Sequence, residues 1–156
     1  MCVRVCGDHN LGLRDRLITL QKCLVRIVCG AGRLSHADPL FAGLSTLKVD
    51  DLFAQCVRVF SYKMSRGMLP GGMASFSSKI IHGHATRGAR SNFYVSHSDS
   101  KSIRNIAPKY WNPLPLKMKQ SPSIASFKVM SKSDLLAPYG SFVCSVRGCR
   151  SCPVPP

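Results

Sequence analysis

With 156 residues, the chain is long enough for one domain that buries a core, and its 45% hydrophobic residues exclude a chain that is disordered throughout. Its 22 Lys and Arg outnumber seven acidic residues and give a formal net charge of +15, which favours a polyanionic partner, with a merely soluble basic protein as the alternative. All seven acids are Asp, and the absence of Glu excludes catalytic schemes that need a Glu or a close Glu/Asp pair.

The positive charge is concentrated in the later part of the chain. Residues 1–60 hold eight basic and five acidic residues, whereas residues 61–156 hold fourteen basic residues and, as acids, only Asp99 and Asp134. Contacts with phosphate groups are therefore expected mainly after residue 60.

No segment of the sequence is expected to cross a membrane. The first residues lack an apolar run of signal-peptide length, and the most apolar later stretch, 17–29, is interrupted by Gln21, Lys22 and Arg26. Without a secretory signal, the eight cysteines are expected to be thiols of an intracellular protein, nuclear or cytoplasmic, and not a disulfide framework.

The first predicted element is an amphipathic helix over Leu11–Cys29. Apolar residues recur along it at alternating steps of four and three, and polar residues follow the opposite side. These apolar residues, which we call the leucine stripe, are Leu13, Leu17, Leu20, Leu24 and Ile27. The stripe is expected to be buried, so that a change at Leu24 would unfold the helical half. Gly30 can adopt the positive φ that ends a helix.

Two further helices are predicted before residue 68. A short helix, Pro39–Leu44, follows Asp38 as its N-cap residue. A long helix, Asp51–Arg66, follows Asp50 in the same role, and Gly67 ends it. Its buried face is expected to hold Leu52, Phe53, Cys56, Val57, Val59, Phe60 and Met64. The expected fold is mainly α, a small helical group of two long helices and several short ones.

Composition divides the whole chain into five segments. These are an N-terminal stub (1–10), a helical region (11–67), a basic loop rich in Gly, Ser and His (68–101), a segment with a C-terminal helix (102–139), and a tail rich in Cys and Pro (140–156). A structureless loop of this length is usually either functional or disordered, and the tail is expected to be disordered.

Shorter elements are predicted within the later segments. The loop could contain an extended piece near 93–95, and 103–112 could form a short helix that ends before Pro113. The last helix is expected to start at the cap and proline of Ser121-Pro122 and to end at Pro138.

Three stretches of the chain, taken in order, form a recognisable pattern. The first is LITLQKCLVRI at 17–27. The second begins with HADPLF at 36–41 and continues through Leu44, Leu47, Asp51-Leu52-Phe53 and Leu69-Pro70. The third comprises Thr86-Arg87, WNPLP at 111–115 and SIASFK at 123–128. In this order and spacing they resemble the region downstream of the polymerase palm in LINE-type, jockey-like non-LTR retrotransposon reverse transcriptases.

The resemblance implies a fragment of the thumb and following region of an RNA-directed DNA polymerase, which would hold template and primer without performing phosphoryl transfer. The family's palm carries paired metal-binding Asp residues in an aromatic-led strand. Here the only Asp pair, Asp50-Asp51, lies at a predicted helix start and is expected to cap that helix. The resemblance therefore implies no catalytic residue and no cofactor in this chain, and the backbone of RNA or DNA as its partner.

Two groups of residues are candidates for contacts with nucleic acid. On the second long helix, one polar and basic stripe contains Gln55, Arg58, Tyr62 and Arg66. In and after the loop lie Arg87, Arg90, Lys101, Arg104 and Lys109, with Phe93, Tyr94, Tyr110 and Trp111 nearby for stacking on bases. An ordinary solvated face is the alternative for the first group. For Trp111, a core position against Leu114 and Phe127 is favoured over stacking.

The tail offers three soft metal ligands, Cys144, Cys149 and Cys152. The CxxC spacing of the last two is typical of a zinc site, but a closed site needs a fourth ligand, which only the distant His97 could supply. Three free thiols are therefore the preferred interpretation. His82 and His84 are not expected to form a specific metal site, and His97-Ser98-Asp99 is not expected to form a catalytic triad, because adjacent residues rarely have the required geometry.

The sequence thus predicts a mainly α protein without a catalytic centre, which binds RNA or DNA without sequence specificity. Two alternatives stay open. One is a basic adaptor whose helical half docks a protein partner and whose tail binds metal, and the other is a translated relic without a function.

Overall fold

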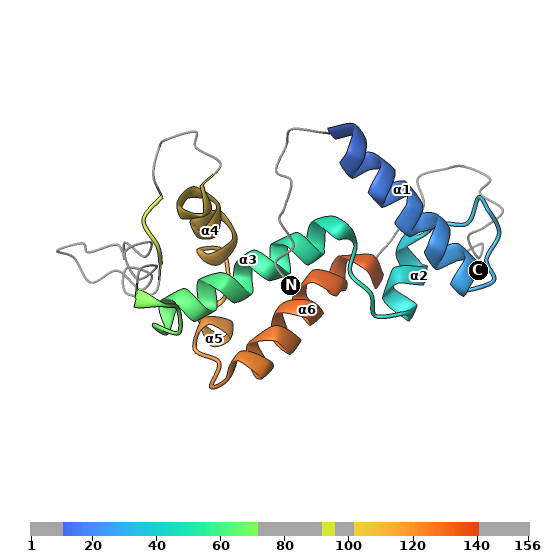
Figure 1. Ribbon diagram of the computed structural model, residues 1–156. Helices are drawn as coiled ribbons and strands as arrows, with labels where there is room; N and C mark the ends of the chain where they lie inside the picture. Colours follow the sequence, from blue (N-terminus) through green and yellow to red (C-terminus); the bar gives the residue numbers. More distant parts are fainter. Residues whose placement is uncertain (1–10, 72–91, 96–101, 141–156) are drawn as a thin grey trace. The chain divides into compact units, whose positions relative to one another are not determined.

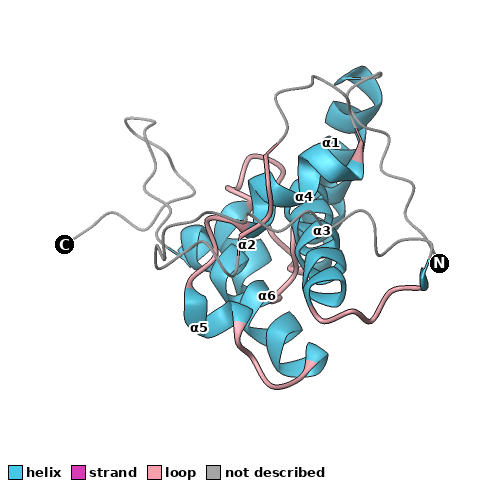
Figure 2. Ribbon diagram, turned by 90° about the vertical axis from the view of Figure 1, so that its left-hand side faces the viewer, coloured by secondary structure: helices cyan, strands magenta, loops and turns pink. Residues whose placement is uncertain are grey.

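A computed structural model describes residues 11–71, 92–95 and 102–140 of the chain. Six helices lie in this part (Figure 1): α1 Leu11–Val28, α2 Asp38–Gly43, α3 Val49–Ser65, α4 Ile103–Trp111, α5 Leu116–Lys119 and α6 Ile124–Gly140. The described ranges contain helices and loops and no β-strand (Figure 2). The predicted mainly α fold class is confirmed. Most of the expected loop 68–101 and nearly all of the expected tail lie outside the described residues.

The chain divides into two compact units, which we call the terminal unit (1–52 and 133–156) and the central unit (53–132). Helices α1 and α2 lie wholly in the terminal unit, and α4 and α5 lie wholly in the central unit. The two longer helices α3 and α6 contribute residues to both. Each unit has its own buried hydrophobic cluster.

Two helices end at the glycines that the sequence marks. Gly30 has a φ of +61° after α1, and Gly67 has a φ of +67° after α3. The residue after each glycine closes the helix end with a backbone hydrogen bond, from Ala31 N to the carbonyl of Arg26 and from Met68 N to that of Lys63, both at 2.9 Å. The predicted stops at Gly30 and Gly67 are confirmed, because only glycine adopts this backbone conformation at little cost.

The carboxylates expected to cap helices bind distant groups instead. Asp38 is the first residue of α2, and its Oδ2 lies 2.9 Å from Nζ of Lys48. Asp50 lies inside the first turn of α3 and accepts a hydrogen bond from Nε of Arg14 at 2.7 Å. The N-cap role predicted for Asp38 and Asp50 is therefore wrong, because both lie inside their helices and their carboxylates have ionic partners elsewhere in the terminal unit.

The side chain of Gln21 on α1 holds the start of α3. Its Oε1 accepts a hydrogen bond from the backbone N of Val49 at 3.0 Å, and its Nε2 donates to the carbonyl of Leu47 at 2.9 Å. One of the N–H groups that a helix leaves unpaired at its N-terminus is thus satisfied from another helix. This fixes α1 against the segment that leads into α3.

Helix α6 starts and ends slightly later than predicted. Its first turn is capped by Ser123, whose Oγ accepts a hydrogen bond from the backbone N of Ser126 at 3.1 Å. The helix continues past Pro138 to Gly140, so the expected termination at Pro138 is wrong. A proline lacks the N–H of one helical bond, and in the last turn of a helix that loss affects little of the remaining structure.

The core of the terminal unit joins α1, α2 and the last turn of α6. Phe41 is fully buried, and its ring meets that of Tyr139 edge to face at a centroid distance of 6.2 Å. The hydroxyl of Tyr139 accepts a hydrogen bond from the backbone N of Lys48 at 3.1 Å and donates one to the carboxylate of Asp51. Burial and the hydrogen bond to Asp51 raise the pKa of Tyr139 above its ordinary value, so the hydroxyl stays a donor at neutral pH.

The leucine stripe of α1 is exposed. Its five members have exposed fractions of 51% (Leu13), 53% (Leu17), 65% (Leu20), 60% (Leu24) and 76% (Ile27). The side of α1 that packs on the unit is centred instead on Val25, which is 5% exposed, and on the hydrogen-bonded Gln21. The expectation that the stripe is buried is wrong, because helical periodicity identifies an apolar face but not the element that covers it.

Two leucines of the terminal unit provide a matched test of this correction. Leu24→Ala is expected to change the free energy of unfolding by less than about 1 kcal/mol, because that side chain is mostly in water already. Leu47 is 2% exposed, and Leu47→Ala should cost about 2–5 kcal/mol through the lost contacts and the cavity left behind. Urea unfolding in dilute solution, followed by circular dichroism, measures both. Equal losses for the two variants would contradict the exposed position of the stripe.

Candidate nucleic-acid interface

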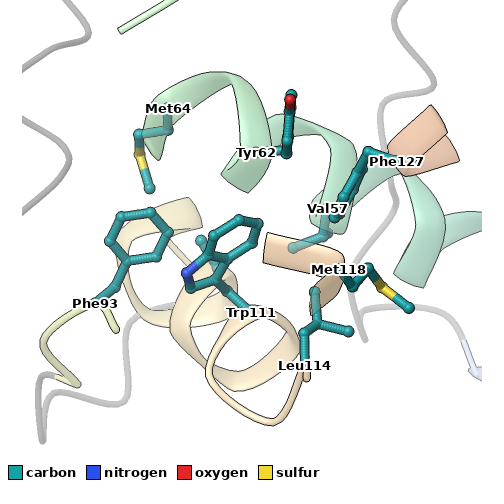
Figure 3. Close-up of a cluster of buried hydrophobic side chains, with 9 residues drawn as sticks. Val57, Tyr62, Met64, Phe93, Trp111, Leu114, Met118 and Phe127 are labelled. Atoms are coloured by element: carbon teal, nitrogen blue, oxygen red, sulfur yellow. The ribbon is translucent and has the colours of Figure 1, made fainter. Parts of the chain in front are cut away.

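The core of the central unit is built around Trp111, at the end of α4. The indole is 1% exposed, and its ring centroid lies 5.5 Å from that of Phe93 and 6.0 Å from that of Phe127 (Figure 3). Leu114 and Met118 belong to the same buried cluster. The core position predicted for Trp111, with Leu114 and Phe127 as its partners, is confirmed.

Polar residues next to Trp111 fasten residues 92–95 to the core. Asn112 makes two hydrogen bonds to the backbone of Phe93, accepting from its N through Oδ1 and donating to its carbonyl through Nδ2, both at 2.9 Å. Lys119, only 8% exposed, donates from Nζ to Oδ1 of Asn92 at 2.8 Å and to the carbonyl of Asn112 at 2.9 Å. Burial lowers the pKa of Lys119. The Trp-Asn-Pro-Leu-Pro motif is thus a structural anchor.

The polar stripe predicted on α3 faces α6 and the residues that lead into it. Gln55 donates to the carbonyl of Lys128 at 3.3 Å, and Arg58 donates to Oγ of Ser131 at 3.5 Å. Two donors share the carbonyl of Ser121, the Tyr62 hydroxyl at 2.9 Å and Nη2 of Arg66 at 3.0 Å. An ordinary solvated face therefore does not describe this stripe, because α6 and the residues before it occupy much of this side of the helix and only Arg66 is exposed.

This packing corrects the role expected of Tyr62. Its side chain is 1% exposed, and its ring stacks on that of Phe127 at a centroid distance of 4.6 Å. The ring therefore cannot stack on a base in the folded chain. Arg58 is half-buried. Arg66 is exposed, and its Cζ lies 5.5 Å from the centroid of the Tyr62 ring. Of Arg58, Tyr62 and Arg66, only Arg66 is therefore exposed to solvent.

The second group of candidate residues, which lies in and after the loop 68–101, is only partly described. Arg104 and Lys109 are exposed on α4, where Ser102 caps the helix by accepting from Arg104 N at 3.4 Å. The other predicted cations, Arg87, Arg90 and Lys101, lie outside the described residues. Among the rings, Phe93 and Trp111 are in the core and Tyr110 meets Phe53 edge to face at 5.6 Å, while Tyr94 is 56% exposed. Of these four described rings, Tyr94 is therefore the one most open to a base.

Three exposed lysines of the central unit were not among the predicted site residues: Lys117 on α5 and Lys128 and Lys132 on α6. The spacing of the last two was a usable signal, because residues four apart share one face of a helix. With them, the exposed cations in the described part of this unit are Arg66, Arg104, Lys109, Lys117, Lys128 and Lys132.

Carboxylates are distributed very differently between the two units. The described residues of the central unit include no Asp or Glu, whereas in the terminal unit Asp50 pairs with Arg14 and Asp38 with Lys48. In the whole of 53–132, thirteen Lys and Arg accompany a single acid, Asp99. The positive potential of the central unit is therefore little reduced by its own side chains.

Possible metal ligands give no site in the part of the chain that is described. Cys23, Cys29 and Cys56 are exposed free thiols, and no group of three or more His, Cys, Asp and Glu within 11–71, 92–95 and 102–140 could hold a metal ion. Cys144, Cys149 and Cys152, with His82, His84 and His97, lie outside these ranges.

The helices were also compared with the length and apolarity that a membrane requires. Within the described residues, none combines the two to the degree needed to cross a bilayer.

Comparison with known proteins adds no family to this picture. No protein-family model, no curated protein and no solved structure matches the chain.

Proposed function

We propose that this chain binds single-stranded RNA or DNA through the phosphate backbone, without sequence specificity, and that the central unit makes the contacts. The observation that carries the proposal is the charge of residues 53–132, thirteen Lys and Arg against one Asp. A large excess of cations over carboxylates attracts a polyanion, whose condensed counterions are released on binding. Such contacts do not distinguish one sequence from another.

Two kinds of described side chain support this proposal, exposed cations and an exposed aromatic ring. Six cations are exposed in the described part of the central unit, five of them on α4 to α6 and Arg66 directly after α3, which provides several positions for phosphate contacts. The exposed ring of Tyr94 lies in a segment that Asn112 and Lys119 fasten to the core. Aromatic rings held on a rigid platform stack on bases of any type, so such a surface binds single strands with little sequence preference.

The resemblance to the post-palm region of non-LTR reverse transcriptases is consistent with such a role. Residues of the three resembling stretches hold the described fold: Gln21 at the start of α3, Phe41 in the terminal core, and Trp111 and Phe127 in the central core. We therefore infer that the chain keeps the scaffold of a template- and primer-holding region. In this role it positions nucleic acid and adds no chemistry of its own.

A matched pair of charge variants tests the assignment to the central unit. Arg104→Gln with Lys109→Gln removes two exposed charges from α4, and Arg16→Gln with Arg33→Gln removes two exposed charges from the terminal unit. The α4 variant should bind single-stranded RNA roughly 25-fold more weakly at 0.1 M salt, since each lost contact costs about fivefold at that salt concentration. Its log–log salt slope should become shallower by about 1.4. Fluorescence anisotropy with a labelled oligonucleotide measures both quantities.

The terminal-unit variant is the control, because it lowers the net charge by the same amount. Its affinity should stay near that of the parent, with only the small general effect of a lower net charge. Equal losses of affinity for the two variants would show that total charge and not the central unit determines binding. An unchanged affinity in the α4 variant would exclude Arg104 and Lys109 from the interface.

A further inference from the structure

Helix α1 presents a continuous apolar face to solvent. The leucine stripe and the neighbouring Val28, which is 63% exposed, all lie on this one face. Single exposed leucines are common on protein surfaces, but a contiguous row of six apolar side chains marks an interaction surface. The adjoining side of the helix, with Gln21 and Val25, is the side that is attached to the terminal unit.

The spacing of the stripe is that of a helix-pairing seam. Its members follow one another at steps of four, three, four and three residues, the 3.5-residue repeat that keeps a narrow apolar line facing a second helix. A helix that packs on a broad core usually shows a wider apolar stripe. The 18 residues of α1 extend over about 27 Å, which accommodates five successive seam positions.

The charges beside the seam favour a second copy of the chain over an acidic helix. Arg14 at one edge is already paired with Asp50, which leaves Arg16 as the one further charge that flanks the stripe. An acidic partner would therefore find almost no cations to pair with. The surroundings of the seam add little to the repulsion between two copies, because the described residues of the terminal unit carry six Lys and Arg and five Asp.

The apolar area of this face of α1 is large enough for pairing with a second copy of the chain. Six Leu, Ile and Val side chains that are each more than half exposed offer on the order of 400 Å² of apolar surface. A standard interface buries roughly 800 Å² on each partner, of which a little over half is apolar. The face therefore supplies most of the apolar part of a modest interface by itself.

We propose that α1 pairs with α1 of a second copy along the leucine stripe, so that the chain forms a homodimer. The contact is apolar and uses none of the cations of the central unit. Since each copy carries a formal charge of +15, added salt should strengthen the dimer by screening the repulsion between the copies. Nucleic-acid binding by the same chain should respond to salt in the opposite direction.

Sedimentation velocity of the full chain tests the proposal, with reductant present to exclude disulfides and after nuclease treatment to exclude bridging by RNA. The parent should associate with a dissociation constant in the micromolar range. Leu20→Glu places a carboxylate in the centre of the seam and should weaken association at least about tenfold. Leu34→Glu, at a position that is 87% exposed and outside α1, is the matched control and should associate like the parent.

Both positions are solvent-exposed, so the variants should keep the helical content of the parent, which circular dichroism checks. Ile27→Lys, at the most exposed position of the stripe, gives a second disruption with the opposite charge and should weaken association as well. A parent that stays monomeric at hundreds of micromolar would overturn the proposal. So would equal effects of Leu20→Glu and Leu34→Glu, or an association that weakens as salt is added.

Discussion

Trp111→Ala is expected to destabilise the central unit by about 3–5 kcal/mol, a large share of the roughly 5–15 kcal/mol that stabilises a typical domain. The indole is 1% exposed and touches rings contributed by α6 and by residues 92–95. Its removal opens a cavity that none of these elements can fill without leaving its own hydrogen bonds. Lys119 would also lose the aromatic face that lies 5.8 Å from its Nζ.

Urea unfolding followed by circular dichroism measures this loss, because Trp111 is the only tryptophan and fluorescence would disappear with it. Trp111→Phe keeps an aromatic ring and should recover part of the stability. Lys109→Ala, at an exposed position of the same helix, is the control and should change the free energy of unfolding by about 0.5 kcal/mol or less. Trp111→Ala and Lys109→Ala variants of equal stability would contradict the central place of Trp111.

Features that depend on neighbouring residues were predictable from the sequence. Helices α1 and α3 begin and end within two residues of their expected limits. Their ends were predictable because Gly30 and Gly67 adopt a backbone conformation that other residues avoid. The burial of Trp111 was predictable for a similar reason, since a single large aromatic residue beside Leu114 has much apolar surface to remove from water.

Features that depend on a distant partner were not predictable. Tyr62 lies on a well-defined face of α3, and α6 covers it. The leucines of α1 lie on an equally well-defined face, but no described element covers them. The carboxylates of Asp38 and Asp50 were equally suited to capping, and their ion pairs with Lys48 and Arg14 depend on the tertiary fold. Burial of Lys119 had no signal in the sequence, because its acceptors are an amide oxygen and a backbone carbonyl.

The second large effect expected is a steep loss of nucleic-acid affinity with salt. If the six exposed cations of the central unit each contact one phosphate of a single strand, the slope of log K against log salt concentration is about −4. A fourfold rise in salt would then lower the association constant by about 300-fold. The effect arises from counterions that the strand releases on binding, so it should be nearly the same for every sequence.

The most direct test of the central claim is this salt titration, performed with labelled single strands of several unrelated sequences and followed by fluorescence anisotropy. The account predicts straight lines of one steep slope, with affinities that differ little between sequences. Affinity that stays constant as salt increases would contradict the account, because it would show that the positive charge of residues 53–132 does not bind phosphate.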